Sequence, residues 1–384
     1  MKHRALRGTR LFNGEQFLED QVLVVNEDGT VQAILLATEV AASSIEDYEG
    51  ILMPGMINAH CHLELSHFKG KIPCGTGLVE FLLCVVRNRK NIPLVPEELV
   101  AAERELWKEG TAGVADICNT TDAIAAKKDS PIQWHNLVEV LNFRDEHLEQ
   151  RMDHFTEVAA AHRAAGLVAV LTPHAPYSVS SGTFQALNEA TVGSIISVHN
   201  QETRAENELF RKGSGDFLKL YTEFNTGLQP FEVYGGNSLQ AWLPYFTKGQ
   251  TILLVHNTYT EEEDILFAKE HAAKYDLTLV YCLCPNANLY IEEALPPVDL
   301  LVKHQCTIVL GTDSYSSNWR LSIATEVATL RKHFPHLPLE TVLKWATTNG
   351  ANALGWSHLG RFAPSLKPGI VLLSEEDYSV QRIF

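Results

Sequence analysis

The chain has 384 residues, of which 45% are hydrophobic and 20% are charged, as in an ordinary globular protein. Its net charge of −16 argues against binding to nucleic acid or to an anionic membrane surface, because both need basic protein surface. No apolar run is long enough for a membrane span, and the basic N-terminus lacks the apolar segment of a signal peptide. We therefore expect a cytoplasmic enzyme of a small molecule, with its seven cysteines reduced.

The first predicted elements form a β-hairpin. Residues 20–26 and 31–36 are β-like runs on either side of a turn at Asp28 and Gly29. Near the other end of the chain, residues 370–374 form another short β-like run between turn residues. The two ends of the chain are therefore expected to share a small sheet.

Between these ends, eight strand-like runs alternate with helix-like stretches. The strand candidates are 51–59, 111–117, 134–141, 167–173, 194–199, 250–256, 277–283 and 306–312. Helical examples are 96–110, 146–166 and 260–275, the last with Thr260 as its expected N-cap. Eight alternating βα units predict an α/β fold closed into a (β/α)8 TIM barrel.

Several strands end on residues that can bind a metal ion or carry a proton. In a barrel of this kind, the chemistry lies at the carboxyl ends of the strands. A single strand-end histidine is more often solvated or structural, but five strands share this pattern. The residues are His60 and His62 after the first strand, His174 after the fourth, His199 and Glu202 after the fifth, His256 after the sixth and Asp313 after the eighth.

The motifs around these residues resemble those of the amidohydrolase superfamily. They read PGMINAHCHLE, LTPHAPYSVS, SVHNQET, LLVHNTY, CPNANLYI and LGTDSYSSN. The branch that they resemble contains cytosine, guanine, S-adenosylhomocysteine and aminodeoxyfutalosine deaminases and triazine chlorohydrolases. The resemblance implies a small composite β-sandwich from residues 1–52 and 356–384 and a metal-dependent hydrolase barrel over 53–355.

The resemblance also implies roles for the strand-end residues. The metal ligands are expected to be His60, His62, His199 and Asp313. Three imidazoles and one carboxylate suit Zn²⁺, with Fe²⁺ as the alternative. The resemblance makes Glu202, His256 and Asp313 catalytic. Asp313 would take a proton from the metal-activated water, His256 would hydrogen-bond that water, and Glu202 would protonate a ring nitrogen of the substrate.

One metal ion is expected rather than two. Binuclear relatives use a carboxylated lysine at the end of the third or fourth strand, and neither 134–141 nor 167–173 contains a lysine. Glu139 on the third strand leaves two readings open. Its carboxylate either faces outward or points into the barrel and joins the site.

The implied activity is hydrolytic deamination of an aminopurine nucleoside with release of ammonia. The HLE and VEVLNFR stretches look most like aminodeoxyfutalosine deaminases, which implies an adenine nucleoside with a 5′ aryl carboxylate and a place in menaquinone biosynthesis. Two alternatives stay open: a related hydrolase acting on another leaving group, such as a base deaminase or chlorohydrolase, and a non-catalytic scaffold. The resemblance leaves a homodimer open.

The expected substrate contacts are less specific than the metal ligands. The resemblance places His174 against the substrate, and Asn286 and Asn288 in a loop that shapes the pocket. A carboxylate tail needs a cation, and Glu64 is a candidate for binding ribose hydroxyls or the base. The candidate cations are Arg144, Arg204 and Arg320.

Overall fold

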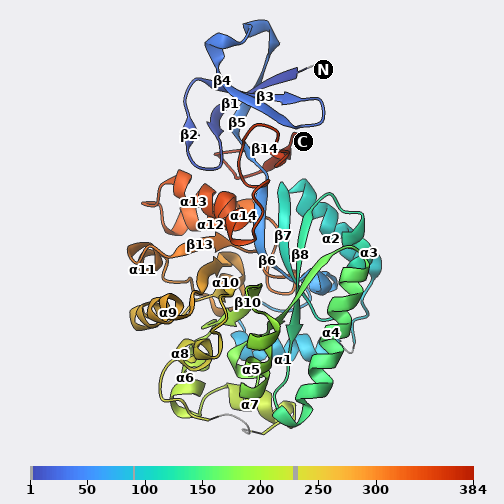
Figure 1. The fold of residues 1–384 in the computed structure, drawn as a ribbon, viewed down its shortest axis with the longest axis vertical. Coiled ribbons are helices and arrows are strands. Elements are labelled where there is room, and N and C mark those ends of the chain that lie inside the picture. The colour runs from blue at the N-terminus through green and yellow to red at the C-terminus, as the bar shows by residue number, and fades with distance from the viewer. Residues whose placement is uncertain (1–2, 90, 228–231) are drawn as a thin grey trace.

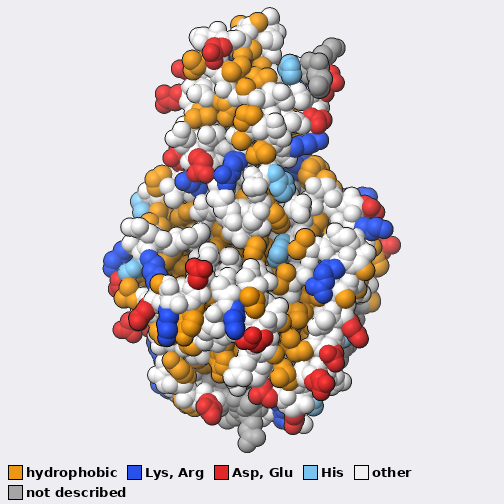
Figure 2. All heavy atoms as spheres, viewed as in Figure 1, with side chains coloured by type: hydrophobic (Ala, Val, Ile, Leu, Met, Phe, Trp, Pro, Cys, Tyr) orange, Lys and Arg blue, Asp and Glu red, His pale blue; other side chains and the backbone are white. Residues whose placement is uncertain are grey.

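The computed structural model describes residues 3–89, 91–227 and 232–384. Figure 1 shows two bodies: a small one that carries both termini and a larger α/β body below it. On the face that Figure 2 shows, Lys and Arg side chains are scattered among Asp and Glu side chains. None of the described helices is long and apolar enough to cross a membrane.

The small body contains strands from both ends of the chain. In the described residues it is one seven-stranded sheet with the order β15-β14-β5-β1-β3-β4, in which β2 pairs with β1. The predicted hairpin is present, since β3 and β4 pair antiparallel and Gly29 takes a φ of 84° in the turn. A sandwich of two sheets is not confirmed. The strands are β1 (His3–Phe12), β2 (Phe17–Leu18), β3 (Gln21–Asn26), β4 (Val31–Leu36), β5 (Ile45–Pro54), β14 (Ile370–Leu373) and β15 (Val380–Arg382).

The predicted strand 51–59 is wrong as a single element. It is divided at Gly55: β5 ends at Pro54, which pairs with Ile370 in the small sheet, and β6 (Met56–Cys61) begins the larger body. A Cβ at Gly55 would lie 2.7 Å from the Ala112 side chain, so the backbone passes close to its neighbours there. Both halves are buried, which is why the apolar pattern alone did not separate them.

The larger body is a TIM-barrel-like α/β fold. Its described strands form two four-stranded parallel sheets, β6-β7-β8-β9 and β10-β11-β12-β13. The sheets meet along both edges: Cys61 and Asp313 form a parallel bridge on one side, and the His199 N–H donates to the His174 carbonyl on the other, at 3.0 Å. The remaining strands are β7 (Thr111–Cys118), β8 (Gln133–Val140), β9 (Val168–Pro173), β10 (Ile195–Asn200), β11 (Thr251–His256), β12 (Thr278–Leu283) and β13 (Thr307–Leu310).

Helices surround these strands, and three of them match the helical stretches expected from the sequence. One detail differs from the prediction: the N-cap of α9 is Glu261 and not Thr260. The Glu261 N–H donates to Asp264 in a capping box, whereas the Thr260 hydroxyl is buried against Gln201. The helices are α1 (Leu78–Arg89), α2 (Pro96–Lys108), α3 (Ile124–Lys128), α4 (Leu148–Ala164), α5 (Ser181–Ala190), α6 (Arg204–Lys212), α7 (Phe217–Glu223), α8 (Ser238–Trp242), α9 (Glu262–Tyr275), α10 (Pro285–Glu292), α11 (Val298–Lys303), α12 (Ile323–His333), α13 (Leu339–Ala346) and α14 (Thr348–Ala353).

Aliphatic side chains fill the space between the strands of the larger body. Ala59, Ile117, Leu253, Val280 and Val309 belong to one buried cluster that draws on both sheets. A second, larger cluster packs the outer faces of the strands against the helices. The strands are therefore held on both faces, which fixes the positions of the side chains at their carboxyl ends.

Candidate metal centre

Four potential metal ligands converge at the carboxyl ends of β6, β10 and β13. The Nε2 atoms of His60 and His62 lie 3.1 Å apart, and His62 Nε2 lies 3.3 Å from His199 Nε2. Asp313 Oδ1 lies 3.5 Å from His60 Nε2 and 3.4 Å from His62 Nε2. The strands bring these atoms together although the residues span most of the chain.

These four spacings are close to those expected between pairs of ligands around a tetrahedral cation. Ligand atoms about 2.0–2.1 Å from a tetrahedral zinc ion are about 3.3–3.4 Å apart, close to the spacings between these nitrogen and oxygen atoms. Burial lowers the pKa of His60 to about 3, and it is also the main reason that the pKa of His199 falls to about 4. The imidazoles are therefore neutral at ordinary pH, as metal ligands must be.

Neighbouring groups orient two of the four side chains. His199 Nδ1 donates to the His174 carbonyl at 2.9 Å, which leaves His199 Nε2 without a proton and facing the other ligands. The Ser317 hydroxyl donates to Asp313 Oδ2 at 2.5 Å, so that Oδ1 remains directed at His60 and His62. Asp313 has a φ of 58°, in the left-handed region that non-glycine residues adopt infrequently and aspartate more readily than most.

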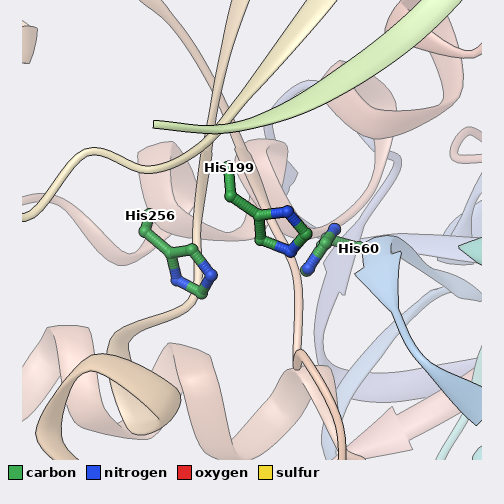
Figure 3. Close-up of side chains that lie close together, drawn as sticks. All are labelled: His60, His199 and His256. Atoms are coloured by element: carbon green, nitrogen blue, oxygen red, sulfur yellow. The ribbon is translucent and has the colours of Figure 1, made fainter. Parts of the chain in front are cut away.

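His256 and Glu202 lie beside this cluster. His60, His199 and His256 have ligand atoms within 4.8 Å of one another, and Figure 3 shows their rings close together. Glu202 Oε1 lies 3.5 Å from His256 Nε2. Burial, and secondarily the nearby Asp313 carboxylate, raises the pKa of Glu202 well above its ordinary value. The carboxyl group of Glu202 can therefore hold a proton inside the site.

The cluster opens into a cavity of about 710 Å³. Its wall is largely apolar and aromatic, with contributions from α1, α4 and α7. Of the residues predicted for the site, seven line the cavity: His62, His174, His199, Glu202, His256, Asp313 and Arg144. His60 is fully buried behind them.

Three predicted substrate contacts lie outside the cavity lining. The Glu64 carboxylate accepts the N–H groups of Asn119 and Thr120, at 3.0 and 2.9 Å. The Asn288 amide lies 3.3 Å from His256 Nδ1, and the Arg204 guanidinium lies over the Tyr259 ring.

The other residues considered from the sequence have partners of their own. Arg320 pairs with Glu109, and Asn286 binds Glu326 and Thr329. Cys282 and Cys284 are buried free thiols.

Glu139, whose direction the sequence left open, faces the interior. It is 3% exposed, and its Oε1 atom lies 3.4 Å from His199 Nδ1. The Asn119 amide donates to its other oxygen at 3.1 Å. Burial is the main reason that its pKa is raised.

Sequence reasoning missed several residues of the cavity wall. Arg89 at the end of α1 and Arg151 on α4 both line the cavity, as do Phe81 and Phe143. They lie on helices and loops away from the strand ends, so the strand-end rule did not point to them. The apolar face of α1 was the one available signal, and it reads equally well as ordinary core packing.

A barrel-like α/β fold with a buried cluster of histidines and one aspartate at the strand ends is typical of metal-dependent hydrolases. The chain belongs to the amidohydrolase family, whose model matches residues 51–383. The resemblance drawn from the motifs is thereby confirmed, and the chain is a hydrolase of the amidohydrolase type.

Individual relatives cover most of the chain. It is 28% identical over 321 residues to the aminodeoxyfutalosine deaminase of a Nitratiruptor species, and the match covers 81% of this chain and 76% of that protein. The structure of the Helicobacter pylori aminofutalosine deaminase in complex with methylthio-coformycin matches with a TM-score of 0.79 and 21% identity, over 97% of this chain and 93% of that one. An adenosine deaminase from Xanthomonas campestris with bound zinc matches with a TM-score of 0.71 and 20% identity, over 97% and 85% of the two chains.

Proposed function

We propose that this protein is a mononuclear, metal-dependent deaminase of an aminopurine nucleoside. The observation that carries the proposal is the position of the buried Glu202 carboxyl beside the cluster of His60, His62, His199 and Asp313. The names of the relatives support an aminodeoxyfutalosine-like or adenosine-like substrate.

The four clustered side chains would hold one divalent cation. A cation bound there would act as a Lewis acid and lower the pKa of a water molecule, which makes that water nucleophilic near neutral pH. Zinc is the expected ion, because the ligand set suits it and a structural neighbour carries it, with iron as the alternative.

Side chains of the protein would carry out the proton transfers. Asp313, whose Oδ2 atom accepts a hydrogen bond from the Ser317 hydroxyl, would take the proton of the attacking water. His256 Nε2 would hydrogen-bond the oxygen that attacks the ring carbon. Glu202 would deliver its proton to the neighbouring ring nitrogen. The amino group would take the proton held by Asp313 and leave as ammonia, and the hydroxyl proton of the tetrahedral carbon would return to Glu202 as the carbonyl forms.

The cavity supports a nucleoside rather than a free base. Its volume of about 710 Å³ is in the range of pockets for drug-sized ligands. His174 lies beside His199 and would contact the bound substrate.

An anionic 5′ group would lie against a cation of the cavity wall, and Arg144 is our candidate. Its guanidinium donates to the Thr226 carbonyl, at 2.7 Å, and pairs with the half-exposed Glu146, at 3.0 Å, and both contacts hold it in place. For Arg204, Glu64 and Asn288, which lie outside the lining, we propose no direct contact with substrate.

Ammonia release from a substrate panel tests the proposal. Zinc-loaded and iron-loaded protein would be offered adenosine, 5′-methylthioadenosine and an adenine nucleoside with a 5′ aryl carboxylate. Adenine, guanine, cytosine and a chlorotriazine serve as comparison substrates. We expect ammonia from the nucleosides, fastest from the carboxylate. Turnover confined to free bases, chloride release from the triazine, or no turnover at all would overturn the proposal.

We further propose a cytoplasmic protein, because all seven cysteines are free. If the aryl carboxylate nucleoside is the preferred substrate, we propose that the enzyme acts in menaquinone biosynthesis, as the resemblance of its motifs implies. A homodimer stays a prediction, which light scattering of the purified protein would test.

A further inference from the structure

One buried carboxylate in the cavity wall has no part in the proposed chemistry. Glu139 lies on β8, between the strand that leads to Asn119 and the strands that carry His174 and His199. In the part of the chain that the structure describes, its Oε1 atom accepts no hydrogen bond, although it is fully buried. A buried carboxylate oxygen without a donor is costly, so its position needs an explanation.

The group that faces this oxygen is the imidazole of His199. Glu139 Oε1 lies 3.4 Å from His199 Nδ1, and the His174 carbonyl accepts from the same nitrogen at 2.9 Å. Two oxygen atoms therefore lie near Nδ1, and the His174 carbonyl is the one that accepts its proton. On the opposite side, His199 Nε2 faces His62.

A second set of contacts holds Glu139 in this position. The Asn119 amide donates both to Glu139 Oε2, at 3.1 Å, and to the Glu139 carbonyl, at 3.2 Å. The backbone of Asn119 and Thr120 is held in turn by Glu64, two residues after His62. A continuous series of contacts therefore connects the histidine pair at the end of β6 with the histidine on β10.

We propose that Glu139 is a positioning residue for His199, held in place by Asn119 and Glu64. The His174 carbonyl accepts the Nδ1 proton, and the nearby carboxylate adds negative charge on the same side of the ring, which favours this tautomer and makes Nε2 a better donor to a cation. This inference rests on the metal centre of the proposed function, but not on the identity of the substrate. The same inference explains why Glu64 of the HLE stretch is buried outside the cavity lining. Glu64 holds the backbone of Asn119, and Asn119 in turn holds Glu139.

Metal affinity and a metal spectrum test this role without any turnover. Glu139→Gln keeps the shape of the side chain but replaces one oxygen by an N–H₂ group, and Asn119→Ala removes the amide that holds the carboxylate. Glu103→Gln is the matched control, because Glu103 is a buried carboxylate on α2 whose partner is the Ser130 hydroxyl. Competition with a chelator gives the affinity for Zn²⁺, and the visible absorption of the Co²⁺-loaded protein reports the ligand geometry.

We expect Glu139→Gln to weaken Zn²⁺ binding by about 10–100-fold and to alter the Co²⁺ spectrum. Asn119→Ala should shift both measurements in the same direction, whereas Glu103→Gln should leave both unchanged. Circular dichroism of each variant checks that it is folded. Unchanged affinity and spectrum in Glu139→Gln would overturn the proposal, and a raised KM with unchanged affinity would assign Glu139 to the substrate instead.

The result of the Zn²⁺ affinity measurement can be distinguished from the result of the substrate panel. A protein that releases no ammonia but loses Zn²⁺ affinity in Glu139→Gln would keep this inference and overturn the proposed deaminase. A protein that deaminates nucleosides while its Glu139→Gln variant binds Zn²⁺ normally would keep the proposed deaminase and overturn this inference.

Discussion

The proposed proton transfer by Glu202 can be tested directly. The side chain is buried, at 3% exposure, and it lies close to His256 and lines the cavity. Its N–H and that of Gln201 are both held by the carboxylate of Glu206, at 3.2 and 2.9 Å. One buried carboxyl group is therefore positioned by another. Glu202 and Glu206 each lead to a separate testable prediction.

Replacing Glu202 by Gln should abolish most of the deaminase activity while leaving the fold intact. A glutamine keeps the size of the side chain but carries no proton that it can transfer to the substrate. General acid–base catalysis contributes about 10²–10⁴-fold, so kcat should fall by that factor. The measurement is kcat on the preferred nucleoside, with the unfolding midpoint as the control. A kcat within about tenfold of the unchanged protein would contradict the role.

Glu206 should make stability depend on pH. Burial raises its pKa to about 7, against an ordinary value of 4.5. Between these values the folded protein keeps the proton that the unfolded chain releases, so the free energy of unfolding falls as pH rises. The slope for one group is at most about 1.4 kcal/mol per pH unit.

The variant Glu206→Gln has no such group and isolates the effect. The free energy of unfolding of the variant, relative to the unchanged protein, should rise by about 1 kcal/mol between pH 5.5 and 6.5. Urea unfolding at both pH values measures this difference. A difference that does not change with pH would show that Glu206 titrates normally.

At the scale of elements, a buried ion pair lies beneath the turn that follows the histidine pair. Lys127 Nζ on α3 lies 2.5 Å from Asp116 Oδ2 on β7, and both side chains are fully buried. The other oxygen of Asp116 accepts the Leu63 N–H at 2.8 Å, directly after His62. The pair therefore connects a helix, a strand and the start of the turn.

Removal of one partner of this pair should be strongly destabilising. Lys127→Met leaves the Asp116 carboxylate buried without its counter-charge, which should cost about 3–5 kcal/mol in the free energy of unfolding. The double variant with Asp116→Asn buries no charge and should recover part of the loss. Urea unfolding of the single and double variants is the measurement. Additive losses in the double variant would mean that the two charges do not stabilise each other.

At the scale of the whole molecule, Arg382 on the small sheet makes contacts with the larger body. Its guanidinium on β15 donates to the carbonyls of Trp107 and Thr111, at 2.8 and 2.7 Å, and lies over the Trp107 ring. Burial lowers the pKa of Arg382 to about 10. Thr111 begins β7, so this contact lies at the end of the strands opposite the candidate site.

Arg382→Ala should therefore lower stability without changing catalysis. The loss of hydrogen bonds from a charged group and of the contact with the tryptophan ring should cost about 2–4 kcal/mol. Thermal unfolding and kcat are measured on the same preparation. A fall in kcat with an unchanged midpoint would show that the small sheet acts on the site.

The fold and the candidate site were predictable from the sequence to different extents. Strand ends such as His199 and Asp313 stood out because the alternation of strands and helices is local, and parallel strands place their ends at one edge. The break at Gly55 was not predictable, because the residues on either side are equally apolar. The partners of Glu64 and Glu139 were also hidden, since they depend on the register between β6, β7 and β8.

The binding stoichiometry of a divalent metal tests the central claim most directly. Protein stripped with a chelator and dialysed against Zn²⁺ should bind one ion per chain. His60→Ala and Asp313→Ala should each abolish tight binding, and His304→Ala, which removes a histidine paired with Glu262 elsewhere, should not. No tight binding in the unchanged protein, or full binding in both ligand variants, would contradict a metal centre built from these strand ends.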